Sequence, residues 1–254
     1  MIKMDIGFST LSMLNKSLNE VIEIASDNNF SMIEILAEGP YASYRLKKDN
    51  RLIKNLKNNN IEINIHGPDV DLNLASINDG IRKESVKQIK DAIDIANEIK
   101  ANTITIHPGK IGRKDKWLRE YALELSIDSI GKCVDYSKQT GKVKISVENM
   151  PERFNYLGNK IEEIEKIQES TGSKITIDTG HANTCKDCEE FFKLKNIEYF
   201  HINDIDGIKD QHLILGEGNL DLKLLKIIDK GIIELNTFEK IMKTKKVLTK
   251  LNYI

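Results

Sequence analysis

The chain has 254 residues, of which 40% are hydrophobic and 30% charged, and its 38 lysines and arginines nearly balance its 39 aspartates and glutamates. This composition can bury a sizeable core, and it excludes collagen-like, mucin-like and fully disordered chains. The formal net charge of −1 excludes a strong overall attraction to nucleic acid or membranes. A local basic patch is compatible with that balance.

The N-terminal sequence MIKMDIGFSTLSML lacks the long apolar segment and the small-residue cleavage site of a signal peptide. No stretch approaches 18 consecutive apolar residues, so we expect no transmembrane span. The three cysteines, Cys133, Cys185 and Cys188, are an odd number and too few for a secreted disulfide scaffold. We therefore expect a soluble cytoplasmic protein, a monomer or a homodimer, with no membrane partner.

Short runs rich in isoleucine and valine alternate along the chain with longer amphipathic stretches. Such runs are typical of strands that are buried on both faces, as in a parallel sheet. They lie at 5–9, 32–36, 61–66, 103–107, 144–148, 174–178, 198–202 and 231–235. Apolar spacings of three and four predict helices at 17–29, 76–99, 117–136, 159–168, 221–229 and 237–251, the first with a capping box from Ser17 to Glu20.

Eight strands that alternate with helices predict an α/β fold, a (β/α)8 TIM barrel with its active site at the C-terminal ends of the strands. An open doubly wound sheet is the alternative, and it usually has a glycine-rich turn after the first strand. Here that turn reads FSTLSMLN and contains no glycine. No linker or shift in composition interrupts the chain, so we expect residues 1–254 to form one domain.

All five histidines lie at or just after the predicted end of a strand, or in the loop after the seventh strand. They are His66, His107, His181, His201 and His212. Four carboxylates lie in the same places: Glu148, Asp178, Asp210 and Glu234. These positions share one face of a barrel. A single histidine would ordinarily be a core or surface residue, but chance does not readily place all five there.

Carboxylates at the ends of apolar strands are costly to bury unless they are paired or bind a cation. The few nearby lysines cannot neutralise this cluster, so a divalent metal is the simplest explanation. Mixed imidazole and carboxylate ligands suit Zn²⁺, Mn²⁺ or Fe²⁺, whereas Mg²⁺ and Ca²⁺ prefer oxygen ligands alone. Nine candidate ligands are too many for one ion, and they suit two or three ions that share bridging carboxylates.

Six motifs surround these candidate ligands. They read HGPDVDLNLAS from His66, IHPG from Ile106, VENMP from Val147, DTGHAN from Asp178, HINDIDG from His201 and DQHLILGEGNLD from Asp210. As an ordered set they resemble the xylose isomerase-like TIM-barrel superfamily, which contains endonuclease IV and many sugar isomerases and epimerases. The resemblance covers essentially the whole chain, and it is specific as a set although each motif alone is weak.

The resemblance to endonuclease IV implies three zinc ions, with all nine ligand types matched. The implied sets are His66, His107 and Glu148 for the first ion, Glu148, Asp178, His201 and Glu234 for the second, and His181, Asp210 and His212 for the third. The resemblance to the sugar epimerases implies one Mn²⁺-type ion held by the second set alone. Its two glutamates would then also transfer the substrate proton.

The loops match endonuclease IV less well than the metal motifs do. That branch usually has a tyrosine after the first histidine motif, where this chain has Pro68-Asp69-Val70, and a Gly-Gln-Gly type loop, where this chain reads NMPERF. Its second loop carries DNA-inserting residues, and here that loop reads AEGPYASYRLKKD. Glu34, in the IEIL end of the second predicted strand, is more similar to the isomerase branch.

The predicted loop after the fourth strand, GKIGRKDKWLRE, is rich in basic residues. Lys110, Arg113 and Trp117 from this loop, with Arg153 from the next, would form a phosphate-binding rim whose tryptophan stacks on a sugar or base. The alternative is a solvated helix start with the tryptophan packed on the barrel. For the Cys185-x-x-Cys188 pair we favour two ordinary thiols, because one pair cannot build a four-cysteine site.

Three classes of function fit these observations unequally. The favoured class is a metal-dependent phosphodiester hydrolase with up to three zinc ions, in which Glu148 orients the attacking water and abasic-site DNA, a DNA-repair substrate, is the family-based candidate. The alternative is a divalent-metal isomerase or epimerase of a small sugar or sugar phosphate, in which Glu148 and Glu234 are the catalytic proton carriers. A non-enzymatic metal-binding scaffold is disfavoured because the whole ligand set is retained.

Overall fold

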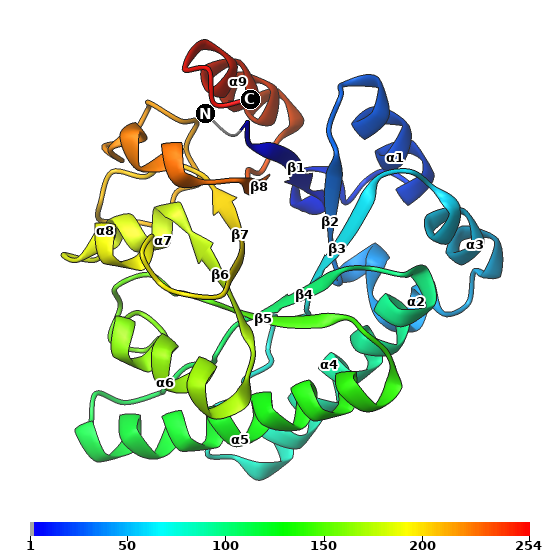
Figure 1. Ribbon diagram of the computed structural model, residues 1–254. Helices are drawn as coiled ribbons and strands as arrows, with labels where there is room; N and C mark the ends of the chain where they lie inside the picture. The colour runs from blue at the N-terminus through cyan, green and yellow to red at the C-terminus, as the bar shows by residue number, and fades with distance from the viewer. Residues whose placement is uncertain (1–2) are drawn as a thin grey trace.

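Eight parallel strands close into a barrel in the computed structural model, which describes residues 3–254 (Figure 1). The strands are β1 (Asp5–Ser9), β2 (Met32–Leu36), β3 (Glu62–His66), β4 (Thr103–Ile106), β5 (Lys144–Glu148), β6 (Lys174–Asp178), β7 (Ile197–Ile202) and β8 (Lys230–Ile233). Each strand pairs with the next in the chain, and β8 pairs with β1 to close the ring. The predicted (β/α)8 barrel is confirmed. Residues 1 and 2 of the predicted domain lie outside this description.

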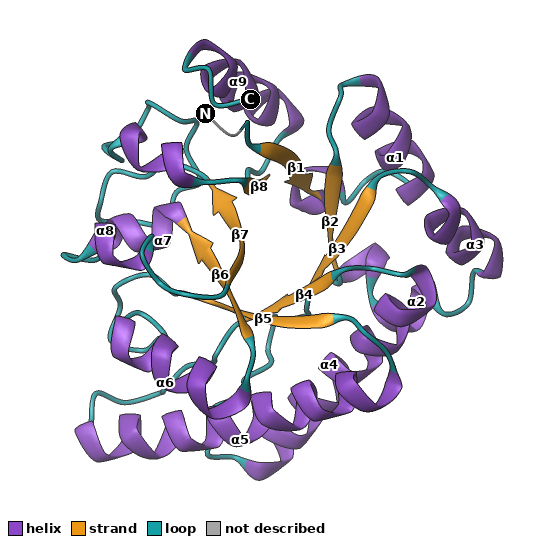
Figure 2. Cartoon of the chain, in the orientation of Figure 1, coloured by secondary structure: helices purple, strands orange, loops and turns teal. Residues whose placement is uncertain are grey.

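Helices surround the barrel and cover the outer face of its strands (Figure 2). They are α1 (Leu18–Asp27), α2 (Ser43–Leu46), α3 (Asn50–Asn58), α4 (Asp79–Ile99), α5 (Lys116–Thr140), α6 (Ile161–Thr171), α7 (Thr179–Thr184), α8 (Cys188–Phe191) and α9 (Phe238–Lys250), with the 3₁₀ turns η1 (Thr10–Met13), η2 (Gly39–Tyr41) and η3 (Leu222–Ile227). Among residues 3–254, no helix is both long enough and apolar enough to cross a membrane.

Every predicted strand is present, with its ends displaced by two residues at most. The predicted capping box also forms at the start of α1. The Ser17 backbone N–H donates to Oε2 of Glu20 at 2.8 Å, and the Glu20 N–H donates to Oγ of Ser17 at 3.3 Å. These reciprocal bonds satisfy N–H groups that have no partner within the helix, which explains why the helix begins there.

The predicted helix at 221–229 is wrong, because residues 222–227 form the 3₁₀ turn η3 instead. Asp221 caps this turn by accepting from the Lys223 N–H, and β8 already begins at Lys230. A 3₁₀ turn rises about 2.0 Å per residue, so it covers more distance than an α-helix with the same few residues. The helices α2, α3, α7 and α8 were not predicted, since most are too short to show an apolar period.

The interior of the barrel is unusually polar at the level where the site forms. Met32, Tyr199 and Ile232 make a small apolar cluster inside the barrel. Beside them, the hydroxyl groups of Thr105 and Thr176 hydrogen-bond each other at 3.0 Å. Inward-facing residues of a barrel are usually branched and apolar. The buried polar layer therefore indicates that these interior residues support the site at the C-terminal mouth of the barrel.

A long loop after β7 carries Asp210 and His212 to the mouth of the barrel, and Asp204 holds this loop in place. Asp204 is fully buried. Its carboxylate accepts backbone N–H bonds from Ile205 at 2.8 Å, Gly216 at 2.8 Å, Gly218 at 3.1 Å and Leu220 at 3.1 Å. One side chain thus joins the two ends of the loop.

Asp204→Ala is expected to lower the free energy of unfolding by about 3 kcal/mol or more, because several buried N–H groups lose their acceptor. The control is Asp206→Ala, which removes an exposed carboxylate from the same loop and is expected to cost about 1 kcal/mol or less. Urea unfolding curves measure both values. Equal stability of the two variants would show that the loop does not depend on Asp204.

Candidate metal centre

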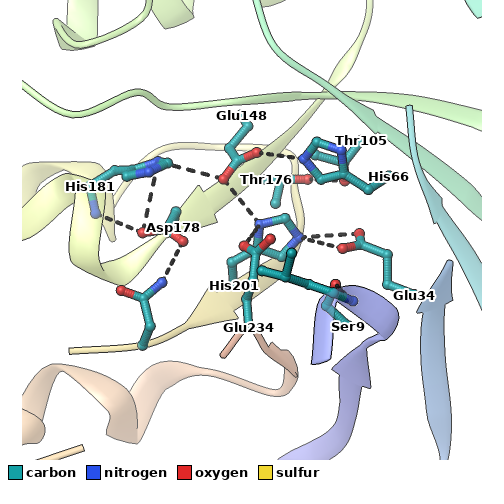
Figure 3. A network of polar contacts seen from close by, with 12 residues as sticks. Ser9, Glu34, His66, Thr105, Glu148, Thr176, Asp178, His181, His201 and Glu234 are labelled. Carbon is teal, nitrogen blue, oxygen red and sulfur yellow. Dashed lines mark hydrogen bonds and ion pairs between the residues drawn. The ribbon is translucent and has the colours of Figure 1, made fainter. Parts of the chain in front are cut away.

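The nine predicted ligands gather at the C-terminal mouth of the barrel, and Figure 3 shows six of them in one polar network. Strands β3, β5, β6 and β7 supply His66, Glu148, Asp178 and His201, the segments after β4, β7 and β8 supply His107, Asp210, His212 and Glu234, and α7 supplies His181. The C-terminal ends of parallel barrel strands share one face, so residues far apart in the chain meet there.

Glu148 lies at the centre of this network. Its Oε2 is 3.4 Å from Nε2 of His66 and 3.2 Å from Nε2 of His107. Its Oε1 is 3.0 Å from Nδ1 of His201 and 3.5 Å from Nδ1 of His181. One buried carboxylate therefore faces histidines on both of its sides, which is the arrangement expected of a bridging metal ligand.

Two groups of candidate ligands meet closely enough to hold an ion each. The ligand atoms of His66, His107 and Glu148 lie within 4.8 Å of one another, and so do those of Glu148, Asp178, His201 and Glu234. In the second group, Oε2 of Glu234 is 3.0 Å from Nδ1 of His201. These two groups coincide with the first and second ligand sets that the family resemblance implies.

The third implied set is linked through the two oxygens of Asp210, but among residues 3–254 it is not one of the groups whose ligand atoms all lie within 4.8 Å of one another. Its Oδ2 lies 3.3 Å from Nε2 of His181, and its Oδ1 lies 3.2 Å from Nε2 of His212. This set is the more exposed one, since about a fifth to a quarter of the Asp210 and His212 side chains is accessible. The third group therefore lies at the rim, above the buried floor formed by Glu148, Asp178 and His201.

Four of the five histidines are oriented alike by a bond from Nδ1. Their Nδ1 atoms lie 2.9 Å from the Gly67 carbonyl (His66), 2.8 Å from the Asn149 carbonyl (His181), 2.9 Å from the Glu234 carbonyl (His212) and 3.3 Å from the Asp69 carboxylate (His107). A carbonyl only accepts, so the proton of a neutral ring lies on Nδ1. Nε2 is then free to bind a cation, as in many metal sites.

Asp178 is held rigidly although it is fully buried. It accepts the His181 backbone N–H at 2.6 Å, as the cap of α7, and the Asn203 side-chain amide at 2.6 Å. Gly180 makes the second bond possible, because a Cβ at that residue would lie 1.9 Å from Oδ1 of Asn203. The carboxylate is thus fixed before any ion binds.

The electrostatics of these side chains also favour a cation. Burial alone would lower the pKa of His66, yet its bond to Glu148 raises that pKa to about 9. Burial is likewise outweighed at His181, where Asp178 raises the pKa to about 9. Burial raises the pKa of Asp178 to about 6. The directions of these shifts show that the carboxylates attract positive charge into the site, and metal binding must displace protons from its ligands.

The donor set fits a divalent metal with mixed ligands. Imidazole nitrogens and carboxylate oxygens converge in a largely buried space, and unpaired carboxylates in such a space are costly. Oδ1 of Asp210 is buried without a hydrogen-bond partner, although the His212 ring lies 3.2 Å away. Zn²⁺, Mn²⁺ and Fe²⁺ accept this combination of ligands.

Two of the four predicted substrate-binding residues line pockets, and one of these pockets contains a candidate ligand. Lys110 shares a small pocket with His107 and Asp69. Arg153 lines a second pocket of about 510 Å³, at the starts of α5 and α6. The other basic residues of that pocket are Lys114, Lys116, Arg119 and Lys160.

The other two, Arg113 and Trp117, lie at the surface near the start of α5. Nε of Arg113 pairs with Asp115 at 3.1 Å. Trp117 is 66% exposed, so it is not packed on the barrel. Neither Arg113 nor Trp117 forms a hydrogen bond or ion pair with a candidate ligand among residues 3–254.

The sequence predicts no role for three residues that lie near the metal centre. Glu34 contacts His201, Tyr199 contacts Glu34, and Asp69 contacts His107. The available signal for Glu34 was a carboxylate inside an otherwise apolar strand, and it lies in the middle of β2 rather than at its end. Asp69 stands where the endonuclease IV pattern has a tyrosine, which was the signal for a local change of role.

The cysteine pair after His181 shows no sign of thiolate chemistry. Cys185 and Cys188 are free and half-buried. Burial raises the pKa of each thiol to about 11. Nucleophilic attack requires the thiolate, which is scarce at neutral pH for such a group.

Comparisons with known proteins agree with this fold. Residues 22–250 match the family described as the xylose isomerase-like TIM barrel. An uncharacterized protein of Methanocaldococcus jannaschii is 34% identical over 91% of this chain and 83% of its own length. A probable endonuclease 4 of Thermoplasma volcanium is 30% identical, over 62% of this chain and 59% of its own length.

A solved structure resembles this chain over nearly its whole length. It is a D-tagatose 3-epimerase-like protein, which is 31% identical to this chain, with a TM-score of 0.84 and coverage of 97% of this chain and 96% of that one. The two kinds of relative thus carry different enzyme names. The family fold is common to both, and a fold of this kind carries several chemistries.

Proposed function

Because the chain belongs to the xylose isomerase-like TIM-barrel family, we propose that it is an enzyme that hydrolyses phosphoester bonds at a centre of up to three zinc ions. Mn²⁺ or Fe²⁺ would suit the same ligands. The candidate substrate is a phosphodiester, with an abasic site in DNA as the family-based candidate, whereas a small sugar phosphate would be the substrate of the alternative isomerase or epimerase. The proposal rests on the site, because this fold carries several chemistries.

The third ligand group is the observation that carries the proposal. A single-ion isomerase needs only Glu148, Asp178, His201 and Glu234. Here His181 and His212 both anchor Nδ1 on a backbone carbonyl and direct Nε2 to the same carboxylate, Asp210. Side chains that only hydrogen-bond a sugar have no need of this arrangement. It supports a multinuclear centre.

Bound zinc would supply Lewis acidity and activated water for attack on phosphorus. Glu148 contacts histidines of the first and second groups, so it would keep two ions close together and orient the attacking water. Lys110, beside His107, would bind a non-bridging phosphate oxygen as a point charge. Arg153 would hold a second anionic part of the substrate at the rim.

A second candidate function is supported by the D-tagatose 3-epimerase-like structure. In that case one ion would lie in the second group, and the two glutamates would remove and return a proton on a sugar carbon. Both Glu148 and Glu234 lie 3.0 Å from Nδ1 of His201, so they flank one space. The remaining histidines would then bind substrate hydroxyl groups.

Metal content separates the two functions. The hydrolase proposal expects about three equivalents of metal per chain in wild type and about two in Asp210→Ala, because only the third group is lost. Asp206→Ala removes an exposed carboxylate of the same loop and should leave three. Elemental analysis of the purified proteins measures these values. One equivalent in wild type, unchanged in Asp210→Ala, would contradict the three-ion centre.

Activity is then tested on bis(p-nitrophenyl) phosphate, on a DNA duplex with one abasic site, and on a panel of ketoses and their phosphates. We expect hydrolysis of a phosphoester that falls by about 10²-fold or more in Asp210→Ala. Interconversion of ketoses without any hydrolysis would overturn the proposal in favour of the epimerase.

A further inference from the structure

We infer that Glu34 is a positioning residue that determines which nitrogen of His201 binds metal. Glu34 lies in the middle of β2 and its side chain is fully buried inside the barrel. Nε2 of His201 lies 3.1 Å from both of its carboxylate oxygens. Figure 3 shows Glu34 on one side of the His201 ring, with Glu148 on the other. The inference rests on the proposed metal centre and assigns this chain's own means of orienting one ligand.

His201 differs from the other four histidines in its orientation. Those four bind a carbonyl or a carboxylate through Nδ1 and turn Nε2 to the centre. His201 does the reverse, since its Nδ1 faces Glu148 and Glu234 at 3.0 Å each. A neutral imidazole has one N–H, and it binds a cation through the other nitrogen. A dedicated acceptor at Nε2 is therefore needed for Nδ1 to be the ligand.

Glu34 meets the requirements of that acceptor, and it is unsuited to be a ligand of the same ion. It lies beyond the Nε2 edge of the ring, whereas the ion would lie at the opposite Nδ1 edge. An ionised carboxylate only accepts hydrogen bonds, so it places the proton on Nε2. A carboxylate behind a metal-bound histidine also increases the basicity of the ligand.

Tyr199 holds Glu34 in place by a hydrogen bond. Its hydroxyl group donates to Oε2 of Glu34 at 2.6 Å and also contacts the Thr105 hydroxyl. Tyr199 is fully buried. Among residues 3–254, no lysine or arginine forms an ion pair with Glu34, and His201 is its recorded ionic partner. The carboxylate of Glu34 is therefore directed to one imidazole.

The test measures zinc affinity and the coordinating atom. Zinc-loaded, ¹⁵N-histidine-labelled protein is studied by long-range ¹H–¹⁵N NMR, which distinguishes Nδ1 from Nε2 coordination, and the chain has only five histidines. We expect His201 to bind zinc through Nδ1 and to keep its proton on Nε2. Competition with a chromophoric chelator gives the affinity of each variant.

Glu34→Leu is expected to weaken zinc binding by about 100-fold and to disturb the His201 signals, because the acceptor is lost. Glu34→Gln keeps an acceptor oxygen without the charge, so we expect about a 10-fold loss with Nδ1 coordination retained. If Glu34→Leu does not fold, the zinc affinity of Glu34→Gln decides whether Glu34 has this role. Tyr199→Phe should give a smaller loss. The matched control is Glu62→Gln, which removes a carboxylate of β3 that pairs with Lys230 rather than with His201.

The outcomes separate this inference from the proposed function. The role of Glu34 alone would be overturned if both Glu34 variants bind zinc with wild-type affinity. It would also be overturned if His201 binds zinc through Nε2 in the wild-type protein. Zinc binding that depends on Glu34, without phosphoester hydrolysis, would support the inference and overturn the hydrolase proposal. A wild-type protein that binds no zinc, manganese or iron would overturn both.

Discussion

Glu148→Ala is expected to retain about one of three metal equivalents and to lose about 10⁴-fold in kcat/KM for a phosphodiester substrate. The reason is that Glu148 contacts His66, His107 and His201, so its loss opens the first and second ligand groups together. The third group, around Asp210, has no recorded contact with Glu148 except through the His181 ring at 3.5 Å. Elemental analysis and steady-state kinetics measure the two effects.

Glu198→Gln is the matched control for this variant. Glu198 is a largely buried carboxylate of the same barrel, and it pairs with Lys144, near the N-terminal starts of the strands. We expect this change to leave metal content and kcat/KM within about threefold of wild type, because it touches no candidate ligand. A Glu148→Ala variant that still holds two or more equivalents would show that Glu148 does not bridge two ions.

The barrel and the convergence of the ligands were predictable for one physical reason. Strands that are buried on both faces need unbroken apolar residues, so their ends are visible as the first polar residues after each run. In a parallel barrel all such ends lie on one face. Glu148 and Asp178 could therefore be placed together from their positions after ISV and ITI, without any knowledge of the distances.

What the sequence did not reveal depends on packing or on partners distant in the chain. The turn at 222–227 has the apolar spacing of a helix, but the nearby start of β8 leaves it too few residues. The role of Glu34 depends on Tyr199 and His201, which are more than 160 residues away. Three of the histidine rings are oriented by backbone carbonyl groups, and any residue type can supply a carbonyl.

Removal of metal is expected to lower the melting temperature by about 10 °C for each site that is emptied. An ion held at a thousand times its Kd stabilises the folded state by about 4 kcal/mol, and 1 kcal/mol corresponds to roughly 2–4 °C in a protein of this size. The effect should be large here because Glu34, Glu148, Asp178 and Glu234 are all buried around His201. Differential scanning calorimetry with and without EDTA measures it.

The variant His212→Ala separates the stability contribution of the third ligand group from that of the first and second groups in the same experiment. His212 belongs only to the third group, so the variant should lose one increment of about 10 °C between its metal-loaded and metal-free forms and keep the other two. The metal-free variant should melt close to metal-free wild type, since His212 is partly exposed and its Nε2 faces only Asp210. If EDTA lowers the melting temperature of both proteins by the same amount, His212 binds no ion. The third group would then be left to bind the substrate, as the epimerase function requires.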